Sequence, residues 1–67
     1  PPSANALARC LELYRQYETL DPMRRCSFQE WVVLKMMCSN ARAGQLVTAF
    51  RAQHGNDWPK SEQVSNA

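Results

Sequence analysis

The spacing of apolar residues predicts a first helix over residues 4–20. At 100° per residue, one side of this segment is apolar and the other is polar. Ser3 suits the N-cap, and Asp21-Pro22 ends the helix because the residue before a proline disfavours the α region. The same pair can cap a single turn over residues 23–25. The apolar side carries Leu7, Cys10, Leu11, Leu13, Tyr14, Tyr17 and Leu20, and the polar side carries Arg9, Glu12, Arg15 and Gln16.

A capping box predicts a second helix over residues 28–38. The Ser27 hydroxyl can accept a hydrogen bond from the Glu30 amide while the Glu30 carboxylate reaches back, and Cys26 and Trp31 occupy the hydrophobic staple positions. This segment is apolar nearly all round, which is typical of a helix that is surrounded. One broad side carries Phe28, Trp31, Val32, Leu34 and Cys38, with Lys35 among them, and the other carries Val33, Met36 and Met37.

A third helix is predicted over residues 41–54, after a stop and a new cap at Ser39-Asn40. Gly55 is suited to end it in the left-handed conformation. Its narrow apolar stripe consists of Ala43, Leu46, Val47 and Phe50.

The remaining chain completes a single helical domain spanning residues 1–67. Trp58-Pro59 is expected to fold back onto the helices, and residues 60–67 form a polar tail that is expected to fray. No stretch alternates with period two long enough for a strand, so the predicted fold class is all-α with three helices.

The apolar second helix raises the question of what covers it. The first and third helices each have one apolar face and can shield about half of it, and a chain of 67 residues has little else to contribute. The simplest prediction is a homodimer in which the second helices pack across a two-fold axis. A different protein could fill the same role, and a plain monomer is the remaining alternative. The predicted dimer or partner interface consists of Trp31, Val33, Leu34, Met36 and Met37.

Composition narrows the class of protein. The chain is 45% hydrophobic and 21% charged, with a net charge of +2, which is globular and only weakly basic. Its three cysteines are an odd number without a Cys-x-x-Cys pair, which indicates reduced thiols and a cytoplasmic protein. No apolar run approaches the ~18 residues that a membrane span needs.

Candidate catalytic and metal-binding residues are sparse. His54 is the one histidine, at the end of the predicted third helix, and no spacing places a nucleophile or a carboxylate pair beside it, so no enzyme activity is predicted. Cys10, Cys26 and Cys38 could join His54 around zinc, but structural zinc sites usually bring ligands in close pairs. Buried thiols are the preferred interpretation, and no metal or cofactor is predicted.

Two functions agree with these patterns. The favoured one is a small regulatory or adaptor protein that binds another protein through its apolar helix, for example an inhibitor (anti-activator) of a transcription factor. The alternative is a nucleic-acid-binding regulator, because the second and third helices can form a helix-turn-helix. The residues for that alternative are Arg24, Arg25, Arg42, Gln45 and Gln53, whose side chains suit phosphates and base edges.

Overall fold

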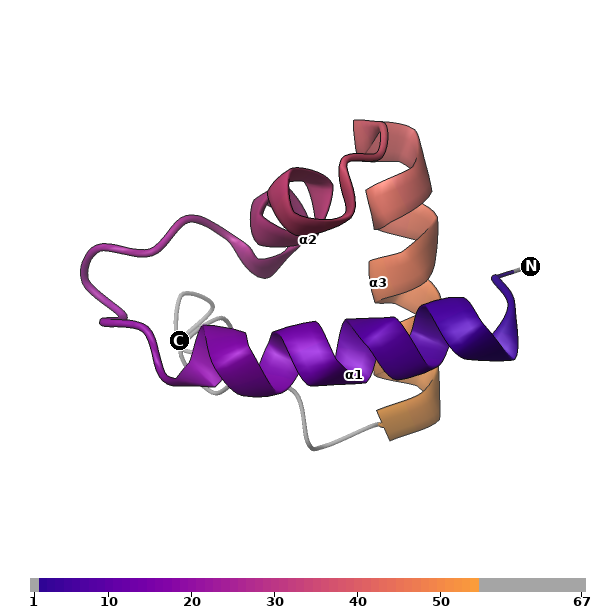
Figure 1. Cartoon of the computed structure of the whole chain (residues 1–67), viewed down its shortest axis with the longest axis horizontal. Coiled ribbons are helices and arrows are strands. Elements are labelled where there is room, and N and C mark those ends of the chain that lie inside the picture. Colours follow the sequence, from indigo (N-terminus) through magenta and orange to yellow (C-terminus); the bar gives the residue numbers. More distant parts are fainter. Residues whose placement is uncertain (1, 55–67) are drawn as a thin grey trace.

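The computed structural model describes residues 2–54, which form three helices and no strand (Figure 1). The helices are α1 (Ala4–Glu18), α2 (Phe28–Met36) and α3 (Asn40–His54). In Figure 1, α1 runs horizontally, α3 runs nearly vertically behind it, and α2 lies above α1 and is seen almost end-on. The predicted all-α fold is confirmed. The expectations for Gly55, Trp58-Pro59 and residues 60–67 lie outside the described residues.

The ends of α1 follow from local hydrogen bonds. The Ser3 hydroxyl accepts a hydrogen bond from the Ala6 amide at 3.1 Å, as expected of the N-cap. The helix stops at Glu18, two residues earlier than predicted, because Thr19 caps it: the Thr19 hydroxyl donates to the Gln16 carbonyl at 2.6 Å. Side-chain capping therefore ends the helix before the proline can.

The predicted single turn after α1 is present and is built around Asp21. Its carboxylate accepts a hydrogen bond from the Met23 amide at 3.0 Å. Its carbonyl accepts the amides of Arg24 and Arg25 at 3.0 and 3.1 Å. This Asx-type turn forms the start of the connection to α2 (residues 19–27).

The start of α2 agrees with the prediction, whereas its end does not. The Ser27 hydroxyl accepts a hydrogen bond from the Glu30 amide at 3.2 Å. The helix ends at Met36, not at residue 38, because Met37 adopts the left-handed conformation (φ 53°, ψ 47°). The amides of Met37 and Cys38 both donate to the Val33 carbonyl, the latter at 3.4 Å, in an ending of the Schellman type.

The turn at Met37 leads directly into α3. The Ser39 hydroxyl accepts a hydrogen bond from the Arg42 amide at 3.1 Å, so Ser39 is the cap and the helix begins at Asn40. The Gln29 side chain donates to the Asn40 carboxamide oxygen at 3.0 Å. A β-carbon at Gly44 would lie 3.4 Å from the Gln29 amide nitrogen, so α2 and α3 approach closely here.

The core is a cluster of aromatic rings surrounded by aliphatic side chains. Tyr14 meets Phe28 edge-on with ring centroids 5.9 Å apart, and Phe50 lies 5.4 Å from Tyr14 and 5.8 Å from Phe28. Such pairs add to the free energy gained by area burial alone. The apolar stripes predicted for α1 and α3 are thus confirmed as the buried faces. The buried residues are Cys10, Leu13, Tyr14, Tyr17, Phe28, Val32, Ala43, Leu46, Val47 and Phe50.

The cysteines are all free in the structure, and only Cys10 fits the expectation of a buried thiol. Cys10 is fully buried, while Cys26 and Cys38 are half-buried. Burial raises the pKa of the Cys10 thiol from its ordinary value of 9.0 to about 11. In the part of the chain that the structure describes, no helix has the length and apolar character of a membrane-spanning segment.

Replacing Ser27 with alanine is expected to lower the free energy of unfolding by about 1 kcal/mol, the usual cost of losing a serine N-cap. Ser27→Asp, whose carboxylate can accept the same amide hydrogen, should retain most of the stability. Urea denaturation followed by circular dichroism measures both. Equal stability of wild type and Ser27→Ala would contradict the role of this cap.

The burial of Cys10 predicts the order in which the thiols react. At pH 8, Ellman's reagent should modify Cys26 and Cys38 promptly and Cys10 only after unfolding, since a buried, protonated thiol is a poor nucleophile. Cys10→Ala should show the same prompt reaction and no additional thiol in guanidinium chloride. Prompt reaction of all the thiols in the native wild type would contradict the burial of Cys10.

Candidate protein-binding surface

The exposed end of α2 carries large apolar side chains. Leu34 is 68% exposed and Met37 is 91% exposed, and they lie three positions apart where the helix ends. The prediction that Leu34 shares the face of Phe28 is therefore wrong: Phe28 and Val32 are buried, whereas Leu34 faces solvent. We call Leu34 and Met37, with the backbone between them, the Leu34–Met37 surface.

The conformation of Met37 is unusual for its residue type. Its φ of 53° is the one positive φ at a non-glycine residue in the described part of the chain. A side chain in this region costs roughly 1–2 kcal/mol, because Cβ approaches the following carbonyl oxygen. Most helices that end in this way carry glycine at this position. Met37 thus combines backbone strain with a side chain that is almost entirely in solvent.

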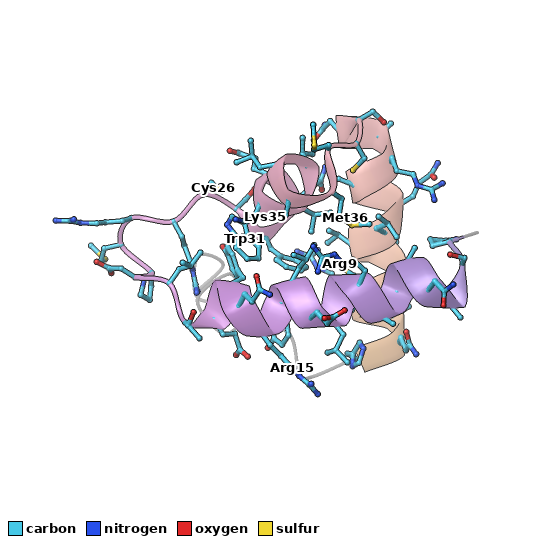
Figure 2. The ribbon with its side chains drawn as sticks, in the orientation of Figure 1. Arg9, Arg15, Cys26, Trp31, Lys35 and Met36 are labelled. Atoms are coloured by element: carbon cyan, nitrogen blue, oxygen red, sulfur yellow. The ribbon has the colours of Figure 1, made fainter. Side chains whose placement is uncertain are left out.

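The other residues of the predicted interface are anchored in the protein. Trp31, Val33 and Met36 are half-buried and pack against the core. The Trp31 ring lies 5.8 Å from that of Tyr17, and the Lys35 ammonium lies 5.2 Å from the Trp31 ring centroid (Figure 2). The helix therefore leaves less bare apolar surface than the sequence pattern predicted, and Leu34 and Met37 account for its fully exposed part.

The structure separates the residues of the predicted nucleic-acid face. Arg42, Gln45 and Gln53 are exposed along α3. Arg24 is exposed and Arg25 is half-buried on the connection between α1 and α2, which lies on the opposite side of α2 from α3 (Figure 1). The described residues therefore contain two separate groups of candidate contacts, and a nucleic-acid function stays a prediction.

Arg24 and Arg25 also differ in how they are held. The Arg25 guanidinium donates to the Tyr17 carbonyl at 2.8 Å and lies 4.2 Å from the Tyr17 ring centroid. Arg24 pairs with Asp21 at 3.8 Å, with its side chain 88% exposed. An exposed pair of this length contributes little to stability. Arg25 is thus a structural cation, whereas Arg24 can reorient toward a ligand.

The candidate zinc ligands are not assembled. Within residues 2–54, no three histidine, cysteine, aspartate or glutamate side chains form a group that could hold a metal ion. Cys10 is in the core, and His54 lies against Phe50 with ring centroids 4.4 Å apart. His54 is thus positioned as a packing residue.

Two features of the surface have no counterpart in the sequence patterns. Met23, 91% exposed, projects from the connection between α1 and α2. A cleft beside Trp31 is formed by residues of this connection and by Trp31 of α2. No periodicity indicates either one, because both depend on how the connection folds back.

The chain matches no protein-family model, and no curated protein or solved structure is significantly similar to it. Any function must therefore be inferred from the physical properties of the surface.

The strain at Met37 leads to a paired prediction. Met37→Gly should raise the free energy of unfolding by about 0.5–1 kcal/mol, because relief of the left-handed strain exceeds the added entropy of the unfolded chain. Met37→Ala removes the same exposed side chain but keeps the strain, so it should leave stability nearly unchanged. Thermal or urea unfolding of the two variants checks this. Equal stabilities would contradict the left-handed conformation of Met37.

Proposed function

We propose that this protein is a small helical binding module that acts through protein–protein contact at the Leu34–Met37 surface. The observation that carries the proposal is the pairing of a strained backbone with an exposed methionine at Met37. A glycine at this position would give a more stable fold, and an exposed methionine side chain adds nothing to the core. Strained residues of this kind cluster at functional sites. Methionine also adapts to irregular apolar partner surfaces.

The proposed partners are a second copy of the chain and another protein that uses the same surface. A standard interface buries about 800 Å² per partner. Leu34 and Met37 alone provide much less, so an interface must extend onto the half-buried Val33 and Met36. Self-association through such a small surface is expected to be weak, with a dissociation constant in the range of about 1–100 µM.

Weak self-association suits an inhibitory role. A protein whose apolar surface is shielded by a labile homodimer can release it to a tighter-binding partner. It can then compete for the surface through which that partner docks or dimerises. An anti-activator of a transcription factor belongs to this class, and it is proposed here as the form of regulation that best suits a small module.

Leu34→Glu is the test of this surface. Leu34 is exposed in a regular helix and glutamate is a good helix former, so circular dichroism should be unchanged. A carboxylate buried without a partner in the interface costs several kcal/mol, so the assembly should dissociate. Sedimentation equilibrium at about 1 mM, above the dissociation constants expected for such an interface, should show masses above 7.7 kDa for wild type and 7.7 kDa for the variant.

Met23→Glu provides the matched control, because it introduces the same charge at an exposed apolar position outside the surface. It should self-associate as wild type does. A wild type of 7.7 kDa at every concentration would exclude the homodimer. Equal dissociation of Leu34→Glu and Met23→Glu would show that net charge, not the Leu34–Met37 surface, controls assembly.

A further inference from the structure

A second concave site lies between the connection (residues 19–27) and Trp31 of α2. It has a volume of about 400 Å³ and is separate from the Leu34–Met37 surface. We call it the Trp31 cleft. Its lining residues are Leu20, Asp21, Arg24, Arg25, Cys26 and Trp31.

The base of the cleft is held in place by Tyr17. The Tyr17 hydroxyl donates to the Cys26 carbonyl at 2.7 Å, and its own carbonyl accepts the Arg25 guanidinium at 2.8 Å. The Tyr17 ring packs against Trp31 on the other side of the connection, at 5.8 Å. The cleft is therefore formed before any ligand binds, which lowers the entropic cost of binding.

Its apolar wall and its hydrogen-bond donors come from different residues. Leu20, Cys26 and the Trp31 ring supply the apolar wall. The indole N–H of Trp31 donates to no other described residue and is not enclosed, so it can bind a ligand. Arg24, with its long and exposed pair to Asp21, supplies a second donor that a ligand can recruit.

The charge beside the cleft is positive. The Lys35 ammonium lies over the Trp31 ring at 5.2 Å, and it forms no ion pair within residues 2–54 (Figure 2). Arg24 and Arg25 line the cleft against the single lining carboxylate of Asp21, and Lys35 lies over the ring of the lining residue Trp31. A carboxylate bound in the cleft would gain charge-assisted hydrogen bonds from Arg24 and Trp31. A nucleic-acid strand instead needs a line of cations and open aromatic faces.

We infer that the Trp31 cleft binds an acidic side chain of a protein partner, an aspartate or glutamate flanked by aliphatic residues. The aliphatic part lies against Leu20 and Trp31, and the carboxylate binds Arg24 and the indole N–H. This inference rests on the proposed function, because it takes the partner to be a protein. It adds the chemistry of that partner: an apolar segment that also carries negative charge.

The test is a titration of the full chain with two short capped peptides, acetyl-Ser-Leu-Glu-Leu-Asp-amide and acetyl-Ser-Leu-Gln-Leu-Asn-amide. The ¹⁵N–¹H signal of the Trp31 indole, assigned by its loss in Trp31→Phe, reports on the cleft. The acidic peptide should shift this signal with saturation at millimolar concentrations, and the neutral peptide should not. Arg24→Glu should weaken acidic-peptide binding by about tenfold or more, the loss expected for a charged partner replaced by a repelling one.

Arg15→Glu is the matched control. Arg15 is an exposed arginine that does not line the cleft and lies on the opposite side of α1 from Trp31 and Cys26 in Figure 2, so the same charge change there should leave binding unaltered. Four results would overturn the inference: no shift with the acidic peptide, equal shifts with both peptides, equal losses in Arg24→Glu and Arg15→Glu, or tighter binding of oligothymidylate than of the acidic peptide.

Repeating the titration with Leu34→Glu separates this inference from the proposed function. Leu34 does not line the cleft, so this variant should bind the acidic peptide as wild type does. Failure of the titration together with dissociation of Leu34→Glu would overturn the cleft and leave the Leu34–Met37 surface standing. A successful titration with unchanged assembly of Leu34→Glu would overturn the Leu34–Met37 surface and leave the cleft standing.

Discussion

Tyr17 is the residue on which the arrangement of the helices depends. Its ring contacts Phe28 at 5.2 Å and Trp31 at 5.8 Å, and so joins α1 to α2 through the core. Its hydroxyl and carbonyl bind the connection at Cys26 and Arg25. One residue therefore fixes both the helix pair and the connection between them. Loss of the ring would remove core packing and release the connection together. Substitutions of Tyr17 and of the residues it contacts are therefore expected to have non-additive effects on stability.

The sequence predicted much of the fold because amphipathic stripes and serine caps are local signals. The stripe around Tyr14 in α1 and the stripe around Leu46 in α3 are buried as expected, and Ser27 caps α2. The end of α2 was not predictable, because the usual signal for a left-handed residue is glycine or asparagine and the chain carries Met37 there. Leu34 was grouped with Phe28 on one broad side of α2 and also assigned to the interface; it is exposed because it lies about 120° from Phe28 around the helix.

The Trp31 cleft illustrates a second limit of local patterns. Arg24 and Arg25 are adjacent in sequence and were predicted to act alike as phosphate contacts. In the structure Arg25 donates to the Tyr17 carbonyl and lies over the Tyr17 ring, whereas Arg24 forms only a weak, exposed ion pair with Asp21. What distinguishes them is the return of the connection onto α1, a tertiary event. The exposed face of Arg24 and the indole of Trp31 thus become neighbours of one cleft only after the connection is in place.

The small core limits how much backbone strain the domain can tolerate. The described residues bury one cluster, in which the rings of Tyr14, Phe28 and Phe50 occupy the centre. A 67-residue domain has a small free energy of unfolding, so the strain at Met37 is a large fraction of it. The cost can be tolerated because the turn at Met37 is anchored on both sides, by the Val33 carbonyl before it and by the Ser39 cap after it. That anchoring fixes the backbone of Met37 at the end of α2, so a partner would bind the exposed side chain with little further loss of backbone entropy.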